Sequence, residues 1–327
     1  MTHSPCARSE LELAELAWGA GFFDGEGSTF AKGSADRPGY LQLCVSVPQR
    51  GGAEKPQVLL RFQSAVLGMG TISPPNEEGV HQWRGRGFTD AQGTIGLLWP
   101  YLGRVKRCQA AKAMRLVRAQ YESGAFRSRR ARSPAVVGPH TVHAPWIGMC
   151  VDPGRLEHPW AAGFLDAEGC FGLARSRARV RGPAWYRIRV SASQHGEEGV
   201  PPDVLVRLQR ALGGFGRIER HGEPDDFKWV VEGVEEVERV VAMTRRWLGP
   251  EKLTQAQRAI TGFSGQVRLK GDAVPCVRGH AYKEQRRKGG RLRRICNACE
   301  RITARRRRAA KGIAPRQFKN LARRYAR

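Results

Sequence analysis

The hydrophobic pattern near the start of the chain predicts a helix. Ser9 and Glu12 have the spacing of a capping box, and an alanine- and leucine-rich stretch follows them. We expect this helix to stop at Gly25 and Gly27, where a glycine backbone with positive φ can leave a helix. The chain is thus expected to open on a capped helix whose last turn carries two acidic residues.

Alternating hydrophobic and polar positions predict strands farther along. One side of a strand would carry Tyr186, Ile188, Val190 and Ala192, and the other Arg187, Arg189, Ser191 and Ser193. Other segments predict helices over about 57–67 and 203–212, short strands around Trp83 and Trp229, and paired helices over about 90–121 and 235–262. The order helix-strand-strand-helix-strand-strand-helix in each half predicts an α+β fold with an antiparallel sheet, whose open face is left to a ligand.

The chain repeats one phrase. The eight residues Ala20-Gly-Phe-Phe-Asp-Gly-Glu-Gly27 return as Ala162-Gly-Phe-Leu-Asp-Ala-Glu-Gly169, 142 residues later. Other residues recur at nearly the same spacing, namely Trp18 and Trp160, Gln49 and Gln194, Trp83 and Trp229, Lys106 and Lys252, and Gln109 and Gln255. Because the offset drifts only from 142 to 146, we interpret the chain as two pseudo-symmetric αββαββα units in tandem.

Charge narrows the class of ligand. The net charge is +26, and residues 265–327 alone hold 21 Lys and Arg against 3 acids, which accounts for 18 of these charges. A polyanion is the expected partner, although a basic tail can also be merely solvated or bind RNA. No apolar run approaches the length of a membrane span, and the eight cysteines form no disulfide framework. We therefore expect a cytoplasmic protein without a membrane partner.

Arginines recur at period two in the second half. They are Arg175, Arg177, Arg179 and Arg181 in one segment, and Arg187 and Arg189 in the next. This spacing would line one sheet face with guanidinium groups, which suit the guanine edges in the major groove of DNA. A solubilising role is the alternative. Together with the charge, the pattern favours contact with double-stranded DNA.

Two repeated acids are the candidate catalytic residues. The small residues of the repeated phrase would allow its two helices to pack side by side, so that Glu26 and Glu168 emerge together at the helix ends. Carboxylates in such an arrangement can hold Mg²⁺, which activates water and neutralises charge during phosphodiester hydrolysis. Asp24 and Asp166, by contrast, are expected to be helix caps or surface residues.

Repeated polar residues complete the predicted site. Gln49 and Gln194 could orient water or complete the metal shell, and Lys106 and Lys252 could offset charge in the transition state. The alternative for the lysines is that they are solvated surface residues on exposed helices.

The doubled phrase and the order of elements over residues 10–263 resemble the LAGLIDADG homing endonucleases in their monomeric, two-motif form. The resemblance implies that Glu26 and Glu168 bind the catalytic Mg²⁺ or Mn²⁺. It also implies saddle-shaped antiparallel sheets that read a long target in the major groove, and cleavage of both strands across the minor groove. The difference between Gln42 of the first half and Arg187 and Arg189 of the second implies an asymmetric target. Trp18 stands where a leucine-like residue is more typical of the family.

A second hypothesis keeps the scaffold and removes the cleavage. An intron-splicing maturase, with intron RNA as its partner, or a DNA-binding regulator could be built on the same two halves. Retention of both glutamates argues against this alternative, although a maturase can also keep them.

The end of the chain predicts a zinc module. Cys276, His280, Cys296 and Cys299 place four soft ligands within 24 residues, in a segment poor in core-forming side chains. Redox-active or idle thiols are the alternative. The segment resembles the small zinc ribbons and knuckles appended to phage and bacterial nucleases. Arg305, Arg306, Arg307 and Arg308 follow as a basic arm that would contact the DNA backbone.

The resulting domain plan has five parts. We expect a first half over residues 1–126, a linker over 127–157, a second half over 158–264, a zinc-binding module over 270–302 and a basic tail over 303–327.

Overall fold

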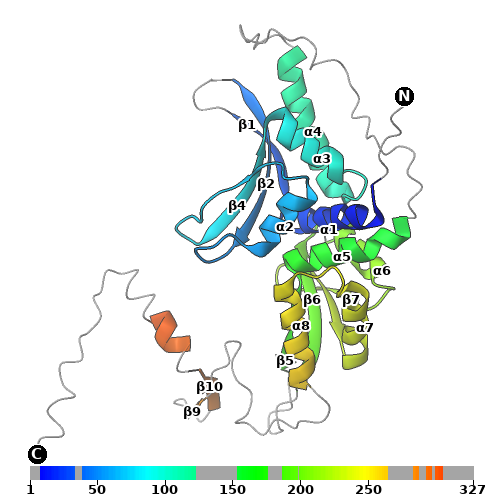
Figure 1. Cartoon of the computed structure of the whole chain (residues 1–327). Helices are drawn as coiled ribbons and strands as arrows, with labels where there is room; N and C mark the ends of the chain where they lie inside the picture. The colour runs from blue at the N-terminus through cyan, green and yellow to red at the C-terminus, as the bar shows by residue number, and fades with distance from the viewer. Residues whose placement is uncertain are drawn as a thin grey trace, which may run out of the picture. The chain divides into compact units, whose positions relative to one another are not determined.

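The structure is a computed structural model (Figure 1). It describes residues 8–33, 39–122, 153–175, 186–197, 199–263, 283–286, 292–296 and 299–304. These residues fall into two compact units. The first draws on Met1–Ala174 and Arg187–Ser264, and the second on Arg175–Tyr186 and Gly265–Arg327.

The first half of the larger unit begins with the predicted helix. Its elements are α1 (Glu10–Glu26), β1 (Ser28–Gly33), β2 (Leu41–Arg50), α2 (Gln57–Ala65), β3 (Thr71–Ile72), β4 (Val80–Arg86), the π-helical turn η1 (Phe88–Gln92), α3 (Gly93–Leu98) and α4 (Arg104–Glu122). The strands form a four-stranded sheet in the order β1-β2-β4-β3, and every neighbouring pair is antiparallel.

The second half repeats this arrangement. Its elements are α5 (Pro153–Glu168), β5 (Cys170–Arg175), β6 (Tyr186–His195), α6 (Asp203–Ala211), β7 (Arg217–Arg220), β8 (Asp226–Glu232), α7 (Val234–Thr244) and α8 (Pro250–Phe263). The sheet order β5-β6-β8-β7 matches that of the first half. The predicted α+β fold of two repeated units is confirmed.

The first helix of the second half begins before residue 158, where the second half was expected to start. Helix α5 begins at Pro153, inside the segment expected to be linker. Proline is favourable in the first turn of a helix because the amide hydrogen that it lacks would have no partner there. The Pro-Gly sequence at residues 153 and 154 therefore starts a helix and does not continue the linker.

The end of α1 differs from the prediction. The capping box at Ser9 and Glu12 is present. The φ angle of Gly27, however, is −77°, so no positive φ is needed there. A Cβ atom at Gly27 would lie 2.2 Å from the ring of Phe23. Gly27 is therefore required by close packing against an aromatic ring.

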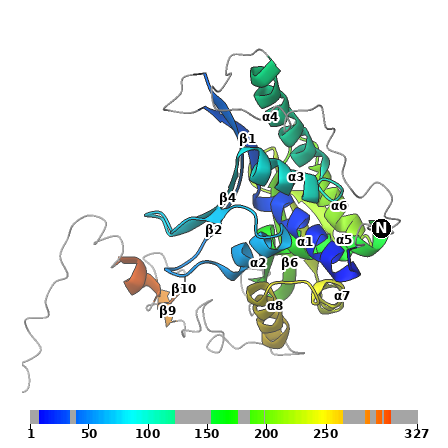
Figure 2. The ribbon, with the colours of Figure 1, turned by 45° about the horizontal axis from the view of Figure 1, so that its top comes forward.

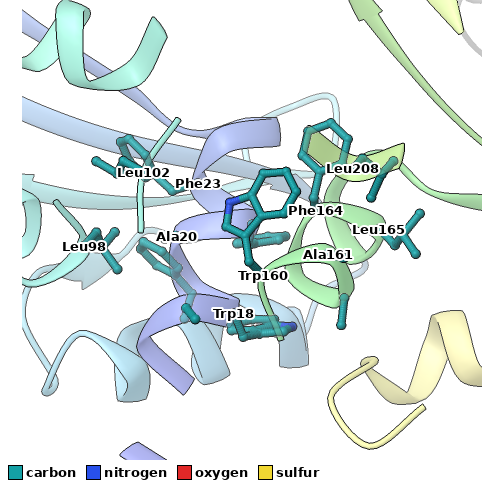
Figure 3. Packing of buried hydrophobic residues seen from close by; sticks show 14 of the residues in the cluster. Trp18, Ala20, Phe23, Leu98, Leu102, Trp160, Ala161, Phe164, Leu165 and Leu208 are labelled. Atoms are coloured by element: carbon teal, nitrogen blue, oxygen red, sulfur yellow. The ribbon is translucent and has the colours of Figure 1, made fainter. Parts of the chain in front are cut away.

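The core is organised around α1 and α5, which lie side by side with one half of the unit on either side (Figures 1 and 2). Trp18 and Trp160 are fully buried at this junction and stack on Phe22 and Phe164 respectively (Figure 3). The stacked pairs place large apolar areas between the two helices, which favours their association.

The backbones of α1 and α5 come into direct contact at two glycines. A Cβ atom at Gly21 would lie 1.9 Å from the carbonyl oxygen of Trp160, and one at Gly163 would lie 1.9 Å from that of Trp18. No side chain fits at either position, so the repeated glycine of the phrase sets the separation of the two helices.

The sheets present one face to the core. Ile188, Val190 and Ala192 are buried, as the alternation predicts. Ser191, predicted on the open face, is also buried, because it lies on one of the two central strands and its small hydroxyl is covered by its neighbours. The other predicted polar residues of this strand are exposed or half-buried.

The smaller unit contains a hairpin and a short helix. Strand β9 (Lys283–Arg286) pairs with β10 (Leu292–Ile295) in antiparallel register, and residues 299–304 are helical. Within the described ranges of both units, no helix combines the length and apolar character needed to cross a bilayer.

The glycine contact generates a stability prediction. We expect Gly21→Ala to lower the free energy of unfolding by about 3 kcal/mol, since the added methyl forces α1 and α5 apart. Denaturant unfolding measures the change. Gly19→Ala is the matched control on the same helix, because its Cβ would meet Ala65 and Leu98 at an ordinary 3.5 Å. Equal effects of the two substitutions would contradict the interpretation.

Candidate active site

Glu26 and Glu168 lie together at the ends of the two central helices. Each is the last residue of its helix, α1 or α5. A Cβ atom at Gly25 would lie 2.5 Å from the Cβ of Ala167 and 3.1 Å from the Cγ of Glu168, so the two helix ends are in contact. Both glutamates are half-buried. The predicted pairing of the acids is thus present in the structure.

The shared environment raises the pKa of both carboxyl groups. Burial raises the pKa of Glu26 to about 7, and the charge of Glu168 adds to this effect, while Lys106 and Lys252 oppose it. Burial also raises the pKa of Glu168, against the opposing effects of both lysines and of a hydrogen bond from Gln194. Two neighbouring carboxylates that are partly removed from water favour a bound cation, because it lowers the free energy of the doubly ionised state.

The lysines of the two halves occupy equivalent positions beside the acids. The Lys106 Nζ donates a hydrogen bond of 2.6 Å to the carbonyl oxygen of Gly27, and the Lys252 Nζ donates one to that of Gly169. Burial lowers the pKa of Lys106, and the surrounding carboxylates partly restore it. Both side chains are half-buried, so neither is the fully solvated residue of the alternative interpretation.

The glutamines differ between the halves. Gln194 donates a 2.8 Å hydrogen bond from Nε2 to the Glu168 carboxylate. The equivalent Gln49 has a buried Oε1 atom that receives no hydrogen bond from the described residues. Its amide oxygen is therefore an available acceptor or ligand in the first half.

The set of side chains near the helix ends suits a hard divalent cation. Carboxylate and amide oxygens are the ligand types of Mg²⁺, which also takes water and substrate oxygens and needs only one or two protein carboxylates. Glu26 and Glu168 supply such oxygens at the contacting helix ends. Among the described residues, no cluster of three or more acids, histidines and cysteines forms a larger metal site.

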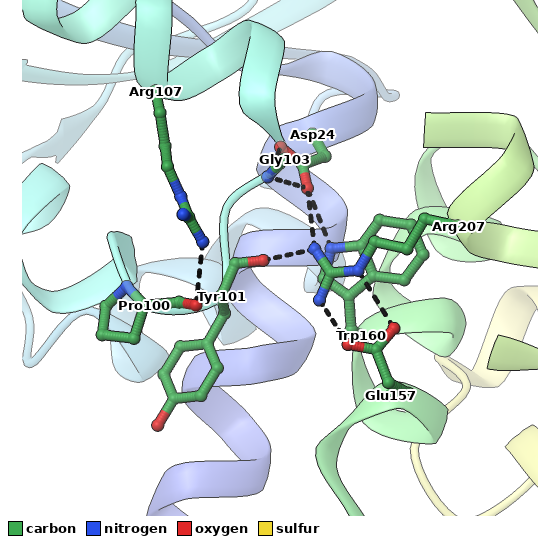
Figure 4. A network of polar contacts seen from close by, with 8 residues as sticks. All are labelled: Asp24, Pro100, Tyr101, Gly103, Arg107, Glu157, Trp160 and Arg207. Carbon is green, nitrogen blue, oxygen red and sulfur yellow. Dashed lines mark hydrogen bonds and ion pairs between the residues drawn. The ribbon is translucent and has the colours of Figure 1, made fainter. Parts of the chain in front are cut away.

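The prediction that Asp24 and Asp166 are helix caps or surface residues is wrong. Both are buried, with 4% of their surface exposed. Asp24 accepts hydrogen bonds from the indole Nε1 of Trp160 at 2.8 Å and from the backbone N–H of Gly103 at 2.8 and 3.0 Å (Figure 4). Burial raises its pKa to about 6 against these bonds.

Asp166, in the second half, has the equivalent partners, and its indole donor comes from the first half. It accepts from the Nε1 of Trp18 at 2.8 Å and from the N–H of Gly249 at 2.8 and 2.9 Å. Burial likewise raises its pKa to about 6. The recurrence of Trp18 as Trp160, and of Gly103 as Gly249, was the sequence signal for this network, but only the fold pairs these residues with the acids.

The open face of the second sheet carries arginines that are paired with acids. Arg187 lies 3.4 Å from Glu232, and Arg217 contacts both Glu232 and Glu219 at 3.5 and 3.0 Å. Arg189 is opposite Glu232 in the strand register. The predicted row of arginines is thus partly neutralised in this sheet.

Several predicted DNA contacts fall beyond what the structure describes. The backbone of Arg175 is the end of β5, whereas its side chain is outside the described part. Arg177, Arg179, Arg181, Arg305, Arg306, Arg307 and Arg308 are also outside the described residues.

The open face of the first sheet is basic in a way that the sequence analysis missed. Gln42 pairs with Lys32, and Cys44 and Ser46 pair with Arg86 and Arg84, so all these side chains share one face. No acid occupies the paired positions of this face in the described strands. The alternation of Arg84 and Arg86 after the buried Trp83 was the available signal.

Two of the four predicted zinc ligands lie in the described part of the smaller unit. Cys296 follows β10 and is buried, and Cys299 lies in the short helix. The Cys299 N–H donates to the Cys296 Sγ at 3.4 Å. Cys276 and His280 lie outside the described residues.

Comparisons with known proteins identify the fold. No model of a protein family matches the chain, and no curated protein matches it. Solved structures do match. The LAGLIDADG meganuclease I-AabMI, bound to uncleaved DNA, is 18% identical, with 76% of this chain and 89% of that chain covered and a TM-score of 0.55. The LAGLIDADG homing endonuclease I-LtrWI, bound to target DNA, is 14% identical, with 77% and 90% covered and a TM-score of 0.57.

A third structure agrees with these two. The LAGLIDADG homing endonuclease I-GzeII, in complex with its DNA target, is 15% identical, with 75% and 88% of the two chains covered and a TM-score of 0.54. The larger unit therefore has the fold of the two-domain LAGLIDADG homing endonucleases.

The raised pKa of Glu26 generates a prediction on stability and pH. The folded-state pKa of about 7 lies above the ordinary glutamate pKa of 4.5, so protonation favours the folded state below pH 4.5 and this contribution is lost as pH rises through 7. We therefore expect Glu26→Gln to raise the free energy of unfolding in EDTA at pH 8, relative to the unsubstituted protein, and to change it little at pH 4.5.

Urea unfolding at the two pH values measures this difference. Glu10→Gln is the control, since Glu10 is exposed at the opposite end of the same helix, and we expect it to leave the pH dependence unchanged. Equal destabilisation by Glu26→Gln at both pH values would contradict a burial cost at this carboxylate.

Proposed function

We propose that the protein is a metal-dependent, site-specific DNA endonuclease of homing type that hydrolyses one phosphodiester in each strand of its target. The observation that carries the proposal is the pairing of Glu26 and Glu168 at the contacting helix ends, with one lysine beside each. The fold, which is shared with enzymes solved in complex with DNA, supports the same function.

Each residue of the site has a proposed role. Glu26 and Glu168 would hold Mg²⁺ or Mn²⁺, and Gln194 keeps the Glu168 carboxylate oriented through its hydrogen bond. When bound, the cation supplies activation of water and neutralisation of phosphate charge. Lys106 and Lys252 keep their ammonium groups beside the glutamates, where positive charge stabilises the phosphorane-like transition state.

The two sheet faces support recognition of a duplex that differs in its two halves. Lys32, Arg84 and Arg86 on the first sheet have no acid opposite them, so they remain available to phosphates and base edges. Arg187 of the second sheet is held by Glu232. A guanidinium that is oriented by a carboxylate loses less conformational freedom when it binds, which lowers the entropic cost of recognition.

The test of the function begins with a target. Duplexes that are cut in the presence of Mg²⁺ are selected from a randomised plasmid library, and the selected duplex is labelled on each strand in turn. We expect Glu26→Gln and Glu168→Gln each to reduce cleavage of at least one strand by more than about a hundredfold while DNA binding survives.

One control variant makes the result specific. Glu10→Gln changes an exposed acid on the same helix as Glu26 and is expected to leave both strand rates unchanged. Cleavage that is unaffected by substitution of both central glutamates would exclude the assignment. Assistance to intron splicing without any DNA cleavage would favour a maturase on this scaffold.

We further propose that the smaller unit holds one structural zinc ion through Cys276, His280, Cys296 and Cys299. The N–H to sulfur bond between Cys299 and Cys296 supports this proposal, because such bonds stabilise a thiolate as a zinc ligand.

Metal analysis of purified protein tests the zinc proposal. We expect about one equivalent of zinc, which is lost in the double variant Cys296→Ala and Cys299→Ala because two of four ligands are removed. Cys108→Ala, at an exposed cysteine of α4, is the control and should retain the metal. Unchanged zinc in the double variant would contradict the site.

A further inference from the structure

We propose that each half of the larger unit positions the active-site residues of the other half. Trp160 and Arg207 are positioning residues for the Glu26 site, and Trp18 and Arg61 are positioning residues for the Glu168 site. The inference rests on the proposed function, since it concerns the same glutamates and lysines.

The first contact between the two halves is a hydrogen bond from an indole group. Trp160, on α5, donates its Nε1 hydrogen to Asp24, which lies on α1 two residues before Glu26. Asp24 is buried, so its charge depends on these donors and cannot be satisfied by water. The end of α1 is therefore held in place by a side chain of the second half.

An arginine also contacts both Trp160 and Asp24. Arg207, on α6, stacks on the Trp160 ring with its guanidinium carbon 3.9 Å from the ring centroid, and its Nη1 lies 3.7 Å from the Asp24 carboxylate (Figure 4). Glu157 binds the other side of the guanidinium at 2.7 and 3.0 Å. This paired, planar contact fixes the orientation of Arg207.

Arg207 also reaches the loop that starts α4. Its Nη1 donates a 2.6 Å hydrogen bond to the carbonyl oxygen of Tyr101. Two residues later, the N–H of Gly103 donates to Asp24, and α4 then carries Lys106 to the carbonyl oxygen of Gly27. The second half thus holds both Glu26 and the lysine beside it.

The opposite direction has the same contacts. Arg61, on α2, stacks on Trp18 at 3.9 Å, binds Glu15 at 2.8 and 2.9 Å, and donates to the carbonyl oxygen of Trp247 at 2.5 Å. Its Nη1 lies 3.8 Å from Asp166, which receives the Trp18 indole hydrogen. Among the described residues, Trp18 and Arg61 make no hydrogen bond or ion pair with Asp24 of their own half. Trp160 and Arg207 likewise make none with Asp166.

The crossed geometry has a functional consequence. Loss of the indole hydrogen leaves a buried carboxylate short of a donor, so the end of the opposite helix must shift to recover one. A shift of about 1 Å at a catalytic group can cost on the order of a hundredfold in rate. The effect falls on the strand that is served by the opposite half, whereas ordinary loss of stability would affect both strands.

The test uses conservative changes and strand-specific rates. Trp160→Phe removes the donor together with part of the ring and retains an aromatic group, and Arg207→Lys provides a second variant at a half-exposed position in case the first does not fold. On the selected duplex with Mg²⁺, we expect each to slow by at least about tenfold the strand that Glu26→Gln slows, and to spare the other strand. Trp18→Phe and Arg61→Lys should affect the strand that Glu168→Gln slows.

Matched controls separate positioning from general destabilisation. Trp229→Phe and Trp83→Phe also remove the indole hydrogen of a fully buried tryptophan, but these donate to the carbonyl oxygens of Phe215 and Met69 within their own halves. They should leave the ratio of the two strand rates unchanged. Equal slowing of both strands by Trp160→Phe, or slowing of the Glu168 strand alone, would overturn the proposal.

Hydrogen exchange distinguishes failure of this inference from failure of the proposed function. Trp160→Phe should accelerate exchange of the Gly103 amide in the first half more than that of the Gly249 amide, and Trp18→Phe should do the reverse. This pattern does not require DNA cleavage. Faster exchange confined to the half that carries the substitution would contradict the crossed network even in an active nuclease.

Discussion

The close contact of α1 and α5 is the constraint on which the rest of the structure depends. Gly21 and Gly163 each bring a helix backbone against a carbonyl oxygen of the other helix, and no residue with a side chain fits there. This separation brings Glu26 and Glu168 together at the contacting helix ends. It also lets the indole groups of Trp18 and Trp160 reach across to aspartates of the opposite half.

This arrangement buries charged groups, which is unfavourable, and hydrogen-bond donors from both halves offset the effect. Asp24 and Asp166 are almost completely removed from water and have raised pKa values, yet each receives an indole hydrogen and a backbone hydrogen. Removing a charge from water without such partners would be strongly destabilising. Among the described residues, the glutamates two residues later have fewer hydrogen-bond donors, since only Glu168 has one, from Gln194.

Pseudo-symmetry does not make the halves equivalent. The first sheet exposes cations with no acid opposite them, whereas arginines of the second sheet are held by Glu232. Gln194 binds its glutamate, whereas the Oε1 of Gln49 has no donor among the described residues. The duplication therefore gives both halves the same fold. Sequence differences on the strands give the two sheets different charged and polar surfaces.

The sequence by itself determined the repeat and the order of elements, because periodicity and local capping are properties of neighbouring residues. The small residues of the repeated phrase also predicted that Glu26 and Glu168 lie together, and the packing of α1 against α5 is what brings them into contact. The sequence could not determine the role of Asp24, which was expected to be a helix cap or a surface residue. That role depends on Trp160 and Arg207, 136 and 183 positions away, and on a helix contact that only the folded chain makes. The tertiary structure likewise decided which cations remain unpaired, because ion pairs across strands depend on register, and register is fixed by packing over the whole sheet.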